Sequence, residues 1–356
     1  GIKRPAELQL PIEPIVRRAG HFFFRGRIDG IDPEQKIVAL SSGMELPYDA
    51  LVVALGGVND TYGVPGADEH ALPFKTVAHC ARIGRVLGTL LARPGPASVV
   101  VVGGGLEGVE ALGEILRRRG AKPQPVVHLV ESGPRLLPAA PPEVHAVLEF
   151  HCRDREVRLH LGVRVERVDE RHVLLSDGEA LPSDLTIWTG GATAPGLLAE
   201  AGLSGSAGGW AKARPTLQAA RHDEVFVAGD AAGLQPALSK QAYHALDMGA
   251  LAARNVARLL TGSRPYPFKP SSKPVLVSFG DLDTFLVAGD RAFAGVALAP
   301  LKEGVFQLVM AQLDPPVTPR GLLGAVGRAA RGVTERGLPA LSSLSSIARL
   351  RGVRAL

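Results

Sequence analysis

The stretch Ser98-Val99-Val100-Val101-Val102-Gly103-Gly104-Gly105-Leu106-Glu107-Gly108 decides the fold of this chain. Four consecutive valines predict a buried strand, and residues 106–119 have the spacing of a helix that Gly120 ends. A second strand over residues 128–130 completes a βαβ unit. The sequence therefore predicts an α/β fold built around a parallel sheet.

The glycines between the first strand and the helix have the spacing G-x-G-x-x-G. Gly103 allows a tight turn, Gly105 lets the backbone approach a pyrophosphate, and Gly108 lets the helix pack closely on the strand. The start of the helix, at Leu106 and Glu107, offers free N–H groups and the positive end of the helix dipole. We predict that a dinucleotide binds here; the alternative is a glycine turn in an unrelated βαβ unit.

An acidic residue, Glu131, ends the second strand, 28 positions after Gly103. A carboxylate at this place accepts hydrogen bonds from the hydroxyls of an adenosine ribose and repels a 2′-phosphate. The residues therefore predict NADH, rather than NADPH, as the bound nucleotide.

The composition is that of a globular α/β protein, with 46% hydrophobic residues and 42 glycines among 356 residues. No apolar stretch reaches the ~18 to 20 residues that a spanning helix needs. The two cysteines form no CxxC pair, which fits a reducing compartment. The chain begins with Gly1 and has no signal-peptide pattern, so we expect a cytoplasmic protein and further residues upstream.

The positive charge is concentrated in the tail, residues 320–356. This segment has seven arginines and one glutamate, or +6, and the net charge of +5 leaves 5 − 6 = −1 for the rest. A nucleic-acid partner is therefore not expected, and we name no metal site. A basic amphipathic helix in the tail predicts attachment to an anionic membrane surface, such as the inner face of the cell membrane. The alternative is a helix packed on the protein itself.

The nucleotide motif lies within a longer pattern that resembles a known family. The segments 103–110 and 130–138, Tyr48-Asp49-Ala50-Leu51-Val52-Val53-Ala54-Leu55-Gly56 and Val225-Phe226-Val227-Ala228-Gly229-Asp230-Ala231-Ala232 are similar to those of type II NADH dehydrogenases. These enzymes belong to the superfamily of flavoproteins with two dinucleotide-binding folds.

The resemblance implies two Rossmann-like domains of the three-layer ββα type, one inserted in the other, with an α+β region at the C-terminus. Residues 98–212 would bind NADH, and residues 1–97 with 213–266 would form an N-terminally incomplete FAD-binding domain. The apolar runs themselves predict that this region, residues 267–319, is β-rich, with strands near 275–279, 284–288, 296–298 and 306–310. The tail would follow it.

The resemblance also implies the chemistry and several site residues. A hydride would pass from NADH to FAD, and electrons would go on to a quinone-like acceptor. Glu110 would position the nicotinamide; its alternative role is that of a first-turn glutamate favoured by the helix dipole. The remaining cofactor-binding residues would be Gly190, Gly191, Gly229, Asp230, Ala231 and Gln241.

Two departures from the family pattern leave alternatives open. The sequence has one G-x-G-x-x-G, whereas such flavoproteins have another near the N-terminus for FAD. Lys240 stands where an alanine often precedes the glutamine that lines the quinone site. We therefore keep two further hypotheses, an NADH-binding module without flavin turnover and a soluble NADH-flavin reductase with another acceptor. The residues leave open whether two copies form a homodimer.

Overall fold

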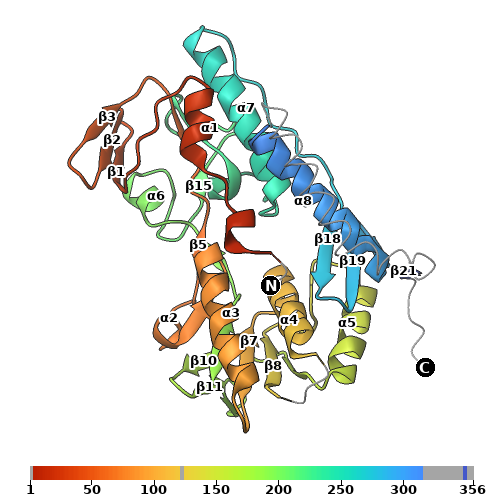
Figure 1. Cartoon of the computed structure of the whole chain (residues 1–356). Coiled ribbons are helices and arrows are strands. Elements are labelled where there is room, and N and C mark those ends of the chain that lie inside the picture. The colour runs from red at the N-terminus through yellow and green to blue at the C-terminus, as the bar shows by residue number, and fades with distance from the viewer. Residues whose placement is uncertain (1–2, 121–123, 316–347, 351–356) are drawn as a thin grey trace. The chain divides into compact units, whose positions relative to one another are not determined.

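The four valines form the centre of a parallel sheet in the computed structural model, which describes residues 3–120, 124–315 and 348–350 (Figure 1). The chain divides into two units. The first comprises Gly1–Ala19, Thr61–Gly191 and Lys273–Leu356, and the second comprises Gly20–Asp60 and Ala192–Ser272.

The parallel sheet of the first unit has five strands. Their order is β6 (Ala71–Pro73), β13 (Leu185–Trp188), β7 (Ser98–Val102), β8 (Val126–Glu131) and β9 (Arg158–Leu161). Strands β7, β8 and β9 follow one another in one direction, whereas β13 and β6 lie on the other side of β7. The strand order therefore reverses beside β7, and ligands of parallel α/β sheets bind at such a switch point.

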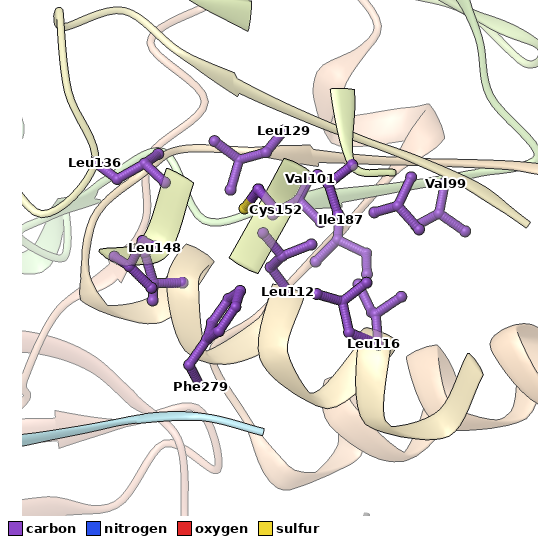
Figure 2. Packing of buried hydrophobic residues seen from close by; sticks show 14 of the residues in the cluster. Val99, Val101, Leu112, Leu116, Leu129, Leu136, Leu148, Cys152, Ile187 and Phe279 are labelled. Atoms are coloured by element: carbon purple, nitrogen blue, oxygen red, sulfur yellow. The ribbon is translucent and has the colours of Figure 1, made fainter. Parts of the chain in front are cut away.

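Helices cover one face of this sheet, and a small antiparallel sheet covers the other. Val99 and Val101 share a hydrophobic core with residues of α3 (Val77–Ala92), α4 (Leu106–Arg119) and α5 (Pro142–Asp154). Figure 2 shows Leu112 of α4 and Leu148 of α5 in this core. Val100 and Val102 pack against β10 (Val165–Val168), β11 (His172–Leu175) and β12 (Ala180–Pro182). This three-layer ββα arrangement confirms the predicted fold class.

The C-terminal part of the first unit packs against α4. Strands β18 (Val275–Phe279), β19 (Asp283–Ala288), β20 (Arg291–Ala294) and β21 (Ala348–Leu350) form an antiparallel sheet. A Cβ on Gly113 of α4 would lie 2.3 Å from the backbone nitrogen of Gly280, so the helix and the turn after β18 meet backbone to backbone. Phe279 enters the main core (Figure 2).

Two of the expected strands in this region are wrong. Residues 296–298 form a 3-10 turn, η3 (Val296–Leu298), and residues 306–310 lie within helix α8 (Ala299–Leu313). A short apolar run has no periodicity that distinguishes a strand from a helix. Residues 306–310 are such a run, and they lie inside a helix of 15 residues. The region is therefore α+β rather than mainly β.

The second unit contains a smaller parallel pair, β4 (Leu51–Val53) with β16 (Val225–Val227), which contacts α7 (Ala242–Leu260). A meander of β1 (Ile28–Asp32), β2 (Ile37–Leu40) and β3 (Glu45–Pro47) lies in the same unit. Short pairs join β5 (Val58–Asn59) to β14 (Ala192–Thr193) and β15 (Ala211–Lys212) to β17 (Ala232–Gly233). Besides η3, the described residues include five shorter helical segments: η1 (Pro5–Glu7), α1 (Ile12–Arg18), α2 (Ala67–His70), α6 (Leu197–Glu200) and η2 (Gly229–Ala231).

The two units do not have the boundaries expected at residues 97/98 and 212/213. Strand β6 pairs with β13 in the nucleotide sheet, so residues 61–97 belong to the first unit. The Pro/Gly stretch at 93–96 is a loop between α3 and β7 within that unit. Residues 192–212 belong to the second unit. The tail, apart from residues 348–350, lies outside the described residues.

Candidate functional site

The turn between β7 and α4 requires glycine at two of its positions. Gly103 has a φ of +105°, and a Cβ there would lie 2.7 Å from Oγ1 of Thr189. A Cβ on Gly108 would lie 1.8 Å from the carbonyl oxygen of Gly103. Both roles agree with the sequence argument: Gly103 makes the turn, and Gly108 allows the close approach of helix and strand.

Gly105 differs from these two glycines because its side faces open space. Among the described residues, apart from its two chain neighbours, no heavy atom lies within 4 Å of a Cβ built on it. Gly105 is the N-cap of α4, so the free N–H groups of Leu106 and Glu107 follow directly. An open cradle at a helix N-terminus fits the approach of a pyrophosphate. Glu107 is half-exposed and pairs with Lys75 at 3.2 Å.

Glu131 lies against the glycine turn. One carboxylate oxygen accepts a hydrogen bond from the N–H of Gly104, and the other accepts one from the N–H of Gly133, both at 2.6 Å. An ionised carboxylate has about four lone-pair positions, so acceptor capacity remains for ribose hydroxyls. The structure thus brings together Glu131 and the glycine motif, as the sequence predicts.

Glu110 faces the C-terminal sheet. Its carboxylate accepts a hydrogen bond from the N–H of Ser278 at 3.1 Å and forms an ion pair with Lys302 of α8. The Glu110 side chain is 28% exposed. Lys302 could not be predicted from the sequence, because a pair separated by 192 positions leaves no local pattern.

Gly190 and Gly191 follow β13, the neighbour of β7. Thr189 links this strand end to the glycine turn, since its hydroxyl donates to the carbonyl oxygen of Val102 at 2.7 Å and approaches a Cβ built on Gly103. A Cβ on Gly191 would lie 2.1 Å from the hydroxyl oxygen of Tyr62. Thr189 and Tyr62 are therefore additional residues of this region, and neither belongs to a sequence motif that predicts it.

The remaining predicted residues lie in the second unit. Gly229, with a φ of +69°, begins η2 directly after the buried strand β16, and Asp230 and Ala231 complete that turn. Gln241 is the N-cap of α7, without a side-chain cap hydrogen bond. The glycine turn of β7–α4 and this second group thus belong to different units.

Lys240 has a defined set of partners in the second unit. Its ammonium donates to the backbone carbonyls of Asp230 and Ala232, both at 2.8 Å, and lies 4.2 Å from the centre of the Trp210 ring. Burial lowers the pKa of Lys240. The lysine that departs from the family pattern therefore fixes the turn after β16.

The described residues provide only part of a binding site for FAD. Residues 229–231 end a buried strand at a tight turn, which suits contact with the middle of such a cofactor. The chain's one G-x-G-x-x-G motif lies in the first unit, beside Glu131. A second pyrophosphate cradle of this type is not found among the described residues of the second unit.

The cysteines form no disulfide, and burial raises the pKa of Cys152 to about 12. Cys152 packs in the main core (Figure 2), as a small apolar residue does. No group of three or more His, Cys, Asp or Glu side chains within the described residues could hold a metal ion. Among the helices described, none has the length and apolar character needed to cross a membrane.

A G-x-G-x-x-G turn at the switch point of a parallel sheet, with an acid ending the next strand, defines a dinucleotide-binding domain of the Rossmann type. A family model described as pyridine nucleotide-disulphide oxidoreductase matches residues 11–249. The chain belongs to the pyridine nucleotide-disulphide oxidoreductase family, and it is an oxidoreductase.

Similar proteins agree with this assignment. The chain is 27% identical over 319 residues to a type II NADH:quinone oxidoreductase of Staphylococcus aureus (strain MSSA476). The matched region covers 82% of this chain and 78% of the relative. A type II NADH:quinone oxidoreductase of Staphylococcus epidermidis is 26% identical over 321 residues, covering 83% and 79%. The structure of NDH2 from Plasmodium falciparum in complex with NADH has a similar fold, with a TM-score of 0.73, 14% identity and coverage of 90% and 86%.

Proposed function

We propose that this chain oxidises NADH and that the electrons pass by way of FAD to a quinone-like acceptor. The observation that carries the proposal is the contact between Glu131 and the glycine turn, which combines an open pyrophosphate cradle with an acid for the adenosine ribose. The names of the two staphylococcal relatives support quinone as the acceptor.

The chain's own residues divide the work of binding NADH. The N–H groups at the start of α4, after Gly105, would bind the pyrophosphate. Glu131 would accept hydrogen bonds from the ribose, and its two bonds to backbone N–H groups hold it in place for that task. Glu110 would position the nicotinamide, with Lys302 and the Ser278 N–H fixing its carboxylate.

A flavin would accept the hydride and release electrons singly or in pairs. Gly229, Asp230 and Ala231 would contact it, and Gln241 would lie near the acceptor, as the family pattern implies. The ammonium of Lys240 donates hydrogen bonds to two backbone carbonyls of its own unit, so the lysine has a structural role. Its presence therefore does not count against a quinone-like acceptor, which we keep as the proposal. A second candidate function is that of a module that binds NADH without flavin turnover. The observation that supports this alternative is the single G-x-G-x-x-G motif of the sequence.

The nucleotide preference tests the role of Glu131. The wild-type chain should bind NADH at least about tenfold more tightly than NADPH, because the carboxylate of Glu131 would repel the 2′-phosphate. Glu131→Gln removes the charge and should narrow this ratio, whereas the exposed strand variant Glu166→Gln should leave it unchanged. Fluorescence titration with both nucleotides measures the ratio. Equal affinities in the wild type would contradict the assignment of Glu131.

We also propose that the basic tail, residues 320–356, attaches the protein to an anionic membrane surface. Each arginine near an anionic bilayer contributes about 1 kcal/mol to binding. Replacing Arg320, Arg328 and Arg331 together by glutamine should therefore release the protein from anionic vesicles at low salt. Co-sedimentation with anionic and neutral vesicles measures this. If wild type and variant stay in solution equally, the tail does not bind membranes.

A further inference from the structure

Tyr62 occupies a turn position that tyrosine rarely adopts. The N–H of Val64 donates to the carbonyl oxygen of Thr61 at 3.0 Å, and φ is +52° at Tyr62 and +68° at Gly63. Positive φ at both central residues is the mark of a type I′ turn, in which asparagine, aspartate and glycine predominate. A bulky residue in this conformation carries backbone strain, and such strain persists at functional sites.

The ring of Tyr62 gains no burial from this arrangement, since the residue is 67% exposed. Its hydroxyl oxygen instead lies 2.1 Å from the position that a Cβ on Gly191 would occupy. Gly191 comes two residues after Thr189, whose hydroxyl reaches the glycine turn. The strained turn therefore places an exposed aromatic ring beside the end of β13.

The sheet topology determines which part of a dinucleotide would lie there. Glu131 ends β8, on one side of β7, and marks the place of the adenosine ribose. The pyrophosphate cradle follows β7 itself. A nucleotide that crosses the switch point must then continue over the end of β13, on the other side of β7. Tyr62, Thr189 and Gly191 all belong to the same unit as the cradle.

We propose that Tyr62 is a binding residue for the nicotinamide half of NADH, with its ring packed against the nicotinamide or its ribose. This inference rests on the proposed binding of NADH to the glycine turn. An aromatic ring is a flat, rigid surface for another ring, and the type I′ turn and the absent side chain at Gly191 give Tyr62 its place.

The variant Tyr62→Asn separates this role from a structural one. Asparagine followed by glycine is the sequence that type I′ turns favour most, so the variant should unfold at the wild-type temperature or above it. Its affinity for NADH should nevertheless fall about tenfold, which corresponds to about 1.4 kcal/mol of ring contact. Tyr62→Phe keeps the ring and should bind NADH like the wild type.

ADP-ribose is the matched control ligand, because it has the adenosine and the pyrophosphate but no nicotinamide. Isothermal titration of NADH and ADP-ribose against the three proteins should show a loss for NADH alone in Tyr62→Asn. An unchanged NADH affinity, or a parallel loss for both ligands, would overturn the role of Tyr62 and leave the nucleotide site standing. A wild-type chain that binds neither ligand would overturn the proposed function itself.

Discussion

Replacing Gly108 by alanine is expected to abolish NADH binding and to lower the free energy of unfolding of the first unit by about 3 kcal/mol or more. The new methyl group would lie 1.8 Å from the carbonyl oxygen of Gly103 and 2.8 Å from Oγ1 of Thr189. The closer of these atoms is backbone and cannot rotate away. Helix α4 would have to move off the strand, and the pyrophosphate cradle at its start would open.

Gly105→Ala is the matched control for this variant. It lies three residues earlier in the same motif, but its methyl group would enter open space, and its φ of −73° suits alanine. The variant should therefore unfold much like the wild type and still lose NADH affinity, because the methyl group occupies the side from which the pyrophosphate approaches. Chemical denaturation with nucleotide titration measures both effects. A Gly108→Ala protein that keeps stability and affinity would contradict the account of the turn.

Gly113→Ala is expected to detach the C-terminal sheet from α4. A Cβ at Gly113 would lie 2.3 Å from the backbone nitrogen of Gly280, and a Cβ at Gly280 would lie 2.3 Å from the carbonyl oxygen of Gly113. Neither backbone can move without separating α4 from β18. We expect a loss of about 3 kcal/mol in unfolding free energy. The hydrogen bond from Ser278 to Glu110 should be lost with it.

The helical glycine Gly249 provides the control for Gly113. It lies within α7, and beyond the helix's own backbone no heavy atom of the described residues lies within 4 Å of a Cβ built on it. Gly249→Ala should therefore stabilise the chain by up to about 1 kcal/mol through helix propensity alone. Thermal denaturation and hydrogen exchange of residues 275–288 compare the two variants. Equal stability of both alanine variants would show that α4 and the sheet do not meet as described.

The sequence allowed the nucleotide-binding core to be predicted almost residue by residue. The helix expected over residues 106–119 has those bounds in the structure, because a glycine turn starts it and Gly120 ends it. The buried strand of valines and the strand that ends at Glu131 were also predicted closely. Local signals of turn, period and cap determine these elements, so a single sequence is enough to find them.

Features that depend on distant residues could not be predicted in this way. The pair of Glu110 and Lys302 and the contact of Tyr62 with Gly191 join residues that no local pattern connects. The apolar run at 306–310 lies inside a helix that extends beyond it on both sides, and its own five residues have no period that distinguishes a helix from a strand. Residues 21–24, which resemble a strand in composition, form no strand, and Phe22 is 87% exposed.

The position of NADH in a crystal of its complex with this chain tests the account most directly. We expect the pyrophosphate within hydrogen-bond distance of the N–H groups that follow Gly105, the adenosine ribose on the Glu131 carboxylate, and the nicotinamide half over the end of β13. A nucleotide that binds away from the β7–α4 turn, or with its adenosine ribose remote from Glu131, would contradict it.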